Sequence, residues 1–188
     1  MKIIGFNGSP RKNENTAFTI NKILESAKEQ GAETKIYDSG AFEIKPCRGC
    51  LGCVESGRCV IKDDMPYDEL EQADALILGS PVYMGQMTAQ AKTFTDRLFA
   101  KITPRFSPRF KEENAGKKLV LVWTQGNPDA DKFREYFDYV KKMFEMLEFD
   151  VKAVQIVAGT RTEPASEKEG LIPVLKKIGA SLVSTEGK

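Results

Sequence analysis

Short runs of consecutive apolar residues predict three buried strands. The runs lie at residues 3–6, 75–78 and 119–123, and each is bounded by glycine, proline or polar residues. Runs of this length are typical of strands that helices cover on both faces. Two other segments, 33–37 and 151–157, intersperse polar residues among apolar ones. This mixture predicts edge strands with partial access to solvent.

Segments with helical periodicity separate these predicted strands. Apolar residues recur on one helical face in the first such segment, and Ser166 with Glu169 predicts a capping box for the last helix. The predicted helices span residues 16–30, 88–99, 131–147 and 166–185. Alternation of strands and helices predicts a parallel sheet with right-handed crossovers.

The polarity of the strands predicts their order in the sheet. Placing the two half-polar strands, the second and the fifth, at the edges leaves the first, third and fourth inside. The resulting order 2-1-3-4-5 is the flavodoxin-like one, whereas the order 3-2-1-4-5 would bury the polar second strand. We therefore predict an α/β fold of three layers with a five-stranded parallel sheet. Its ligand should bind where the loops after the first and third strands open.

Length and charge narrow the class of protein. A chain of 188 residues predicts a single domain, 1–188, with ample material for a core. The net charge of +1 gives no long-range attraction to nucleic acid or to an anionic membrane. No apolar stretch approaches the roughly 20 residues of a membrane span, and no leader-like segment opens the chain. We expect a cytoplasmic protein.

The chain contains no histidine. Hydrolytic mechanisms built on a Ser-His or Cys-His pair are therefore excluded, and so are zinc sites with histidine ligands. Thiolates, hydroxyls, carboxylates, cationic side chains or a bound cofactor must supply the chemistry. We expect a cofactor.

All four cysteines of the chain fall in one segment with the spacing C-x2-C-x2-C-x5-C, namely Cys47, Cys50, Cys53 and Cys59. A cubane iron–sulfur cluster needs such a spacing, because each of its irons takes one soft ligand from the protein. Structural zinc usually uses two cysteine pairs that lie farther apart, and disulfides are disfavoured in the cytoplasm. A redox-active thiol pair is a further alternative. We predict a cluster loop at residues 46–60 that holds one [4Fe–4S] cluster.

Two acidic residues, Asp63 and Asp64, follow the cluster loop. They precede a short predicted helix that leads to the third strand. We interpret them as an N-terminal cap of that helix and not as metal ligands.

The loop after the first strand, residues 7–16, leads directly into the first helix. It combines helix-start amides and the helix dipole with a cation, two hydroxyls and a side-chain amide, which together suit a phosphate monoester. The candidate residues are Ser9, Arg11, Asn15 and Thr16. The loop is neither G-x-G-x-x-G nor a P-loop, which favours a mononucleotide over a dinucleotide. A polar turn with Thr16 as a cap is the alternative.

The loop after the third strand, residues 79–87, lies opposite in the predicted sheet. Tyr83 can lie against a planar cofactor, and the backbone of Met84 and Gly85 can approach the polar edge of an isoalloxazine. Packing alone is the competing interpretation. The loop after the fourth strand is expected to complete the rim with Gln125 and Gly126. We expect Trp123, within that strand, to be a core residue.

The connection at residues 101–118 is long for a link between a helix and a strand. Its two phenylalanines, Phe106 and Phe110, each follow an arginine. A lid, a subunit contact, a disordered excursion and a plain surface loop are all compatible with this pattern.

Three segments together resemble a known family. They are GFNGSPRKNENT (5–16), PCRGCLGCVESGRCVIKDDM (46–65) and ADALILGSPVYMGQMTAQAKTFTDR (73–97). The chain resembles the iron–sulfur flavoprotein branch of the NAD(P)H-dependent FMN reductase, or flavodoxin-like, superfamily. The resemblance is strong over about the first hundred residues and rests on element order beyond Arg97.

The resemblance implies FMN in the crevice and a [4Fe–4S] cluster on the four cysteines. It implies a phosphate site at Ser9, Arg11, Asn15 and Thr16, and a ring site at Pro81, Val82, Tyr83, Met84 and Gly85. It also implies a homodimer or homotetramer in which the cluster lies near the flavin of a neighbouring subunit.

The leading functional hypothesis is an electron-transfer flavoprotein, an FMN-dependent oxidoreductase that couples FMN to the cluster. Its redox partner would be ferredoxin or NAD(P)H, with no nucleic acid or membrane involved. One alternative is an NAD(P)H-dependent FMN or quinone reductase without a functional cluster. Another is a non-enzymatic metal-binding or redox-sensing module.

Overall fold

The computed structural model describes residues 1–54, 56–102 and 115–184. Most of the long connection 101–118, between the predicted helix 88–99 and the predicted strand 119–123, lies outside the described part, namely residues 103–114. The roles considered for that connection therefore remain untested.

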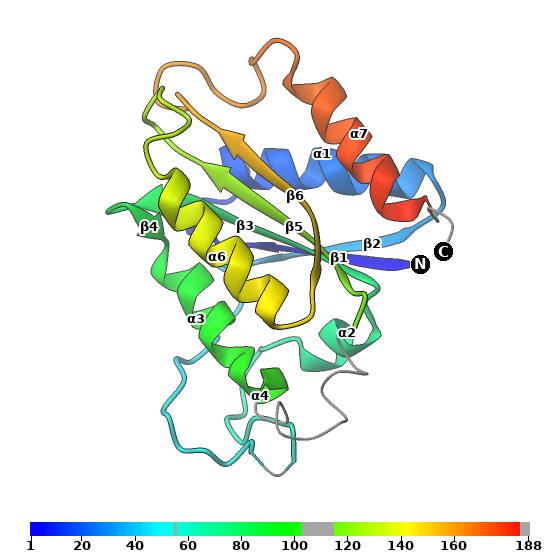
Figure 1. Cartoon of the computed structure of the whole chain (residues 1–188), viewed down its shortest axis with the longest axis vertical. Helices are drawn as coiled ribbons and strands as arrows, with labels where there is room; N and C mark the ends of the chain where they lie inside the picture. The colour runs from blue at the N-terminus through cyan, green and yellow to red at the C-terminus, as the bar shows by residue number, and fades with distance from the viewer. Residues whose placement is uncertain (55, 103–114, 185–188) are drawn as a thin grey trace.

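Strands and helices alternate along the described chain (Figure 1). The strands are β1 (Lys2–Asn7), β2 (Glu33–Asp38), β3 (Ala75–Tyr83), β4 (Gln86–Met87), β5 (Lys118–Thr124) and β6 (Asp150–Val157). The helices are α1 (Asn15–Glu29), α2 (Tyr67–Gln72), α3 (Ala89–Arg97), α4 (Phe99–Ile102), α6 (Arg134–Met146) and α7 (Leu171–Val183).

The sheet has the predicted order. Its strands follow the path β2-β1-β3-β5-β6 with parallel pairing throughout, and β4 adds a short antiparallel strand to β3. Counted without β4, this path is the order 2-1-3-4-5, so the prediction is confirmed. The edge strands β2 and β6 keep exposed or half-buried residues along most of their length, whereas β1 and β5 are almost entirely buried.

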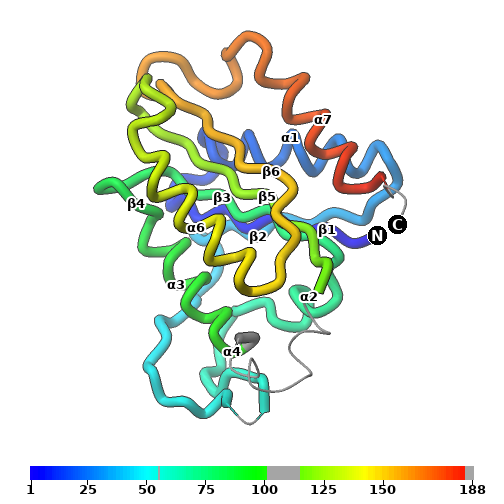
Figure 2. The backbone as a smooth tube through the Cα atoms, viewed as in Figure 1, coloured from blue at the N-terminus to red at the C-terminus, as the bar shows by residue number. Residues whose placement is uncertain are grey.

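Helices cover both faces of the sheet, as Figures 1 and 2 show. On one face α1 and α7 lie side by side, and on the other lie α3 and α6. Alternate residues of β1 face the two layers, with Ile3 in the core under α1 and α7 and Phe6 in the core under α3. The Phe6 ring stacks on Phe94 at 3.9 Å. Trp123 is 2% exposed and stacks on Phe137 of α6, which confirms it as a core residue.

The last helix begins later than the sequence predicts, and its predicted capping box is wrong. Helix α7 starts at Leu171, and its N-cap is Gly170, with a φ of 77° and no side-chain capping bond. The preceding residues form turns instead, and the backbone amide of Ala165 donates to Asn15 Oδ1 at 2.6 Å. This bond holds the segment against the start of α1.

Helices α1 and α7 approach each other closely at Gly179. A Cβ atom at this position would lie 2.3 Å from the carbonyl oxygen of Ile23 and 2.7 Å from the Cβ of Ser26. Nearby, Ser26 Oγ donates a hydrogen bond to the carbonyl oxygen of Lys176 at 2.7 Å. The absence of a side chain at Gly179 therefore sets how near the two helices lie.

A buried ion pair joins the end of α3 to the segment that precedes α2. Arg97 Nη1 lies 2.5 Å from Asp63 Oδ2, and the two side chains are 0% and 2% exposed. Helix α2 begins only at Tyr67, with Pro66 as its N-cap and no side-chain capping bond. The interpretation of Asp63 and Asp64 as a helix cap is therefore wrong. A carboxylate in this interior needs a cation, and Arg97 supplies it.

The ion pair determines the ionisation of both partners. Burial by itself raises the pKa of Asp63, but hydrogen bonds from Arg97 and from the backbone amides of Lys45 and Met65 outweigh it, so the pKa lies below its ordinary value. Burial lowers the pKa of Arg97, and the contacts with Asp63 and Tyr67 raise it by more. Both groups therefore stay charged near neutral pH.

Replacement of Gly179 by alanine tests the contact between α1 and α7. Alanine in a helix normally stabilises relative to glycine by about 1 kcal/mol. Here the clash with the backbone of α1 reverses the sign, and we expect Gly179→Ala to lower the free energy of unfolding by about 1–3 kcal/mol. Urea unfolding measures the change, with the exposed Ser181→Ala on the same helix as control. A stabilised Gly179→Ala variant would contradict the close contact.

Replacement of Asp63 by asparagine tests the ion pair. Removing one partner leaves Arg97 buried and unpaired, so we expect Asp63→Asn to lower the free energy of unfolding at pH 7 by about 3 kcal/mol. Because the pKa of Asp63 is depressed, the charged carboxylate contributes stability above about pH 4 and loses it as the pH falls further. The difference between wild type and variant should therefore shrink in acid.

The matched control for that experiment is Asp68→Asn. Asp68 is 72% exposed and lies 3.5 Å from Arg58, so its replacement should change stability little at any pH. Equal losses in Asp63→Asn and Asp68→Asn at pH 7 would refute the buried pair.

Candidate functional site

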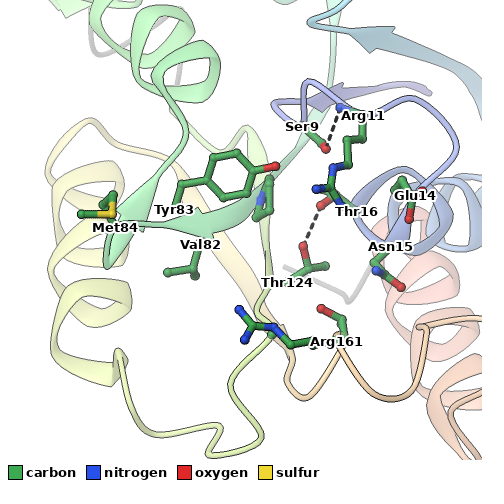
Figure 3. Close-up of a pocket in the computed structure, with 13 residues that line it drawn as sticks. Ser9, Arg11, Glu14, Asn15, Thr16, Val82, Tyr83, Met84, Thr124 and Arg161 are labelled. Carbon is green, nitrogen blue, oxygen red and sulfur yellow. Dashed lines mark hydrogen bonds between the residues drawn. The ribbon is translucent and has the colours of Figure 1, made fainter.

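A cavity of about 580 Å³ opens at the carboxyl ends of β1, β3 and β5 (Figure 3). This is the switch point, because β1 continues toward β2 on one side and β3 toward β5 on the other. The cavity is lined by Ser9, Arg11, Glu14, Asn15, Thr16, Pro81, Val82, Tyr83, Met84, Thr124, Gly126, Thr160 and Arg161. All the predicted cofactor residues except Gly85 and Gln125 are among them.

The loop after β1 is held tightly against β3 and α3. The amide of Gly8 donates to the carbonyl oxygen of Gly79 at 2.8 Å, and Thr88 Oγ1, the N-cap of α3, donates to the carbonyl oxygen of Gly8 at 2.5 Å. A Cβ atom at Gly8 would lie 2.6 Å from the Cβ of Ala91. Only glycine fits at this approach, so the start of the loop has a fixed position.

A chain of polar contacts fixes the next residues of the loop. Ser9 is 3% exposed, and its amide donates to Asn7 Oδ1 at 3.1 Å. Asn7 Nδ2 in turn donates to Asp38 Oδ1 at 2.8 Å. Ser9 Oγ accepts from the amide of Arg11 at 3.1 Å, as Figure 3 shows. The loop is therefore preorganised, and its Arg11 side chain is directed into the cavity.

The start of α1 presents donors to the same cavity. Its N-cap, Glu14, makes no side-chain capping bond. An N-cap side chain usually accepts from the amides of the first helical turn, and here it does not. Thr16 Oγ1 and Thr124 Oγ1 lie 2.7 Å apart and connect α1 to β5. A helix N-terminus beside a cation and hydroxyl groups suits an anion with several oxygens.

The other wall of the cavity belongs to the turn between β3 and β4. Residues Val82 and Tyr83 pair with Met87 and Gln86, which leaves Met84 and Gly85 as a two-residue turn with φ values of 49° and 81°. This turn matches the twist of the strands. The Tyr83 ring points toward the loop after β1 (Figure 3). Gly85 does not line the cavity.

Gln125 does not line the cavity, and its side chain holds the loop after β5 in place. Its side chain is buried, and Nε2 donates to the carbonyl oxygens of Asn127 at 3.2 Å and Asp129 at 2.6 Å. The residue thereby holds the loop after β5, and the adjacent Gly126 reaches the cavity. Arg161 lies over Gly126, with its Nε 3.5 Å from where a Cβ would be.

Four lining residues escaped the sequence analysis, namely Glu14, Thr124, Thr160 and Arg161. Glu14 belongs to the predicted phosphate loop 7–16, and Thr124 directly follows the predicted strand 119–123. Thr160 and Arg161 come from the connection after β6. Carboxyl ends of parallel strands meet at one edge of a sheet, so the connection after the fifth predicted strand could have been searched for them.

The cysteine loop lies elsewhere, below α4 in Figure 1. Cys47 and Cys50 are exposed, Cys53 is buried and Cys59 is half-buried, and none of them forms a disulfide. Within the described residues, no three cysteine or acidic side chains form a group suited to a metal ion. The structure therefore does not bring the predicted ligands together, and their role stays a prediction.

Helix α3 separates the two features. Its N-cap Thr88 touches the loop after β1, whereas Cys47 borders a second cavity with Thr95 and Phe99, at the other end of α3. Nine residues at a rise of about 1.5 Å each make this helix about 14 Å long.

Among the described helices, none is long and apolar enough to cross a membrane.

Comparisons with known proteins identify the family of the chain. The NADPH-dependent FMN reductase family model matches residues 1–133. An iron–sulfur flavoprotein of Methanosarcina thermophila is 44% identical over 99 residues, which are 52% of this chain and 52% of the relative. An iron–sulfur flavoprotein of Methanocaldococcus jannaschii is 41% identical over 142 residues, which are 74% of this chain and 70% of the relative. The chain spans about half the length of several curated relatives that it matches.

A solved structure supports the fold. A flavodoxin from the domain Archaea superposes with a TM-score of 0.57 over 97% of this chain and 96% of that chain, at 14% identity. The fold is thus flavodoxin-like, as predicted. Since the family model covers well over half of the chain and the Methanocaldococcus relative most of its length, this chain belongs to the NADPH-dependent FMN reductase family, in its iron–sulfur flavoprotein branch.

Proposed function

We propose that the chain is an FMN-dependent oxidoreductase that binds FMN in the cavity at the switch point and holds a [4Fe–4S] cluster in the cysteine loop. Bound flavin exchanges hydride or single electrons, and a cluster exchanges one electron at a time. Its redox partner would be NAD(P)H or ferredoxin. A reducing compartment such as the cytoplasm would keep the four thiols available as ligands. We further propose that residues 1–188 act as one domain and assemble as a homodimer or homotetramer.

One observation carries the flavin part of this proposal. Phosphate candidates from the loop after β1 and ring candidates from the end of β3 and the turn after it line a single cavity of about 580 Å³. They come from segments some seventy residues apart in the sequence. A volume of this size lies within the range of cofactor sites, about 300–1,000 Å³.

The donors at one end of the cavity fit a phosphate. Arg11 supplies a full positive charge, the α1 amides supply partial ones, and Ser9 and Thr16 supply hydroxyls. The oxygens of a phosphate monoester would take up these groups together. The preorganised loop lowers the cost of ordering them on binding.

The opposite end of the cavity fits a planar ring. Pro81 and Val82 offer an apolar surface, and Tyr83 offers an aromatic face that is 42% exposed. These groups would orient a flavin ring and exclude water from one of its sides. Arg161 adds a second cation on the far rim, over Gly126, which suits an anionic redox partner.

The cluster part of the proposal rests on the ligand chemistry and on the relatives. Four soft ligands in one short loop are the donor set of a [4Fe–4S] cluster, and curated relatives bear the name iron–sulfur flavoprotein. The described cysteines do not form a group suited to a metal ion. That observation favours a second candidate, an NAD(P)H-dependent FMN or quinone reductase in which the cysteines hold no cluster.

Replacement of Arg11 tests the phosphate site. One charge-assisted hydrogen bond contributes about 1.5–3 kcal/mol, so we expect Arg11→Ala to weaken FMN binding by about tenfold to a hundredfold. Fluorescence titration of flavin into the full-length protein measures the affinity. The matched control is Lys12→Ala, which removes a neighbouring cation that does not line the cavity. Equal affinities of wild type and Arg11→Ala would exclude this site.

Iron and sulfide analysis distinguishes the two candidates. Protein purified without oxygen and supplied with iron and sulfide should hold about four of each per chain, and Cys50→Ser should lose most of both while it retains FMN. Ser56→Ala in the same loop should keep them. Wild-type protein that binds FMN but no iron or sulfide would refute the cluster and leave the second candidate.

A further inference from the structure

We propose that the buried pair of Arg97 and Asp63 is a positioning device for the cysteine loop. It ties both ends of residues 46–60 to the end of α3, and so determines how the four thiols are presented. What those thiols hold rests on the proposed function. The tie itself is a feature of the described side chains, and it can be tested whether or not a cluster is present.

The contacts of the pair reach both stems of the loop. Arg97 Nη1 donates to the carbonyl oxygen of Lys45 at 2.7 Å, where the chain enters the loop. Arg97 Nη2 donates to the carbonyl oxygen of Ile61 at 3.5 Å, where the chain leaves it. Asp63 Oδ2 accepts from the amide of Lys45 at 2.9 Å, and Oδ1 accepts from the amide of Met65 at 3.2 Å. One ion pair therefore joins two segments separated by the whole loop.

We call the junction of these two stems, where Lys45, Ile61 and Asp63 meet Arg97, the neck of the loop. Neighbouring groups stabilise it further. Asp64 Oδ2 accepts from the amide of Glu43 at 2.9 Å, and the amide of Asp64 donates back to the carbonyl oxygen of Glu43 at 3.4 Å. The Tyr67 hydroxyl donates to the carbonyl oxygen of Arg97 at 2.8 Å, and the Tyr67 ring lies 5.7 Å from the guanidinium. The neck is thus fixed from both stems, from α2 and from α3.

The position of the neck explains why it would govern the thiols. The carbonyl groups that Arg97 binds belong to Lys45 and Ile61, each two residues from a terminal cysteine of the motif, Cys47 or Cys59. The described residues between them contain no helix or strand. Fixing the two ends of an irregular loop removes much of its conformational freedom. This restriction is strongest at the outer cysteines, Cys47 and Cys59, because they lie nearest to the fixed ends.

The contacts of Arg97 with Asp63 and with two backbone carbonyl groups require a guanidinium group. A positive charge alone would not make all of them. Its planar fork reaches a carboxylate and two carbonyl oxygens at once, whereas an ammonium group is a single point. Arg97→Lys keeps the charge opposite Asp63 and loses the fork, and Arg97→Met keeps much of the volume and loses both. A residue that merely fills the core would tolerate these changes without any effect specific to the loop.

Thiol reactivity of the full-length protein tests the inference directly. Alkylation of each cysteine, followed by mass spectrometry, should be about tenfold faster at Cys53 and Cys59 in Arg97→Lys than in wild type, because a loosened loop exposes them. FMN affinity should stay unchanged, because the cavity lies at the other end of α3. Unchanged rates in a folded Arg97→Lys protein would overturn the proposal.

The matched control is Arg58→Ala. Arg58 is an arginine of the same loop that also pairs with a carboxylate, Glu71 at 3.1 Å, but it is 65% exposed. Its replacement should leave the alkylation rates within about twofold of wild type. An equal acceleration in Arg58→Ala would overturn the special role of the buried pair.

Two further readouts keep the proposal falsifiable where variants unfold or no cluster forms. In wild-type protein, hydrogen exchange at the amides of Lys45 and Met65 should be much slower than within residues 47–59, and equal rates would overturn the neck.

If wild type takes up iron and sulfide, Arg97→Lys should retain less than half of the iron and sulfide or show an altered electron paramagnetic resonance signal. An identical load and signal would overturn the positioning role. Wild type without iron refutes the cluster, while the thiol rates still decide on the neck.

Discussion

Everything at the cavity depends on how closely the loop after β1 can approach β3 and α3. At Gly8 the backbone lies against the carbonyl group of Gly79 and the side chain of Ala91, and a Cβ atom there would overlap both. This approach fixes the path of residues 9–14 and directs Arg11 and the α1 amides into one space. The strand order then adds the turn after β3 on the other side. A tight backbone contact thus converts two distant loops into one site.

The patterns that predict the fold are those that burial imposes on strands. Apolar runs identified the inner strands, and the mixed composition of β2 and β6 identified the edges, because an edge strand keeps contact with solvent. Most of the cavity wall followed from the topology, since loops at the carboxyl ends of neighbouring parallel strands must converge. The predictions failed where local motifs compete with contacts from distant segments. Ser166 and Glu169 have the spacing of a capping box, but the segment is held by Asn15 instead.

Asp63 shows why the buried ion pair could not be predicted from the sequence. Its sequence neighbourhood suggests a helix cap, whereas its partner Arg97 lies at the end of a helix thirty-four residues later. A pair of single charged residues far apart in the sequence leaves no repeating pattern. Only the folded structure shows that the two side chains meet. Gln125 is a similar case, because its position beside Gly126 suggests the rim and its amide group is occupied in holding the loop after β5.

Helix α3 connects the cavity to the stems of the cysteine loop. Its first turn is bound to the loop after β1 through Thr88, and its last residue, Arg97, is bound to the neck of the cysteine loop. A nine-residue helix is a stiff element, so the cavity and the neck keep a constant relation to each other. This relation also separates them by about the length of the helix. At the far end of this helix, Cys47 and Cys50 are exposed together with Leu51 and Val60, whereas Cys53 is buried and Cys59 half-buried, so the loop offers its thiols unequally to solvent.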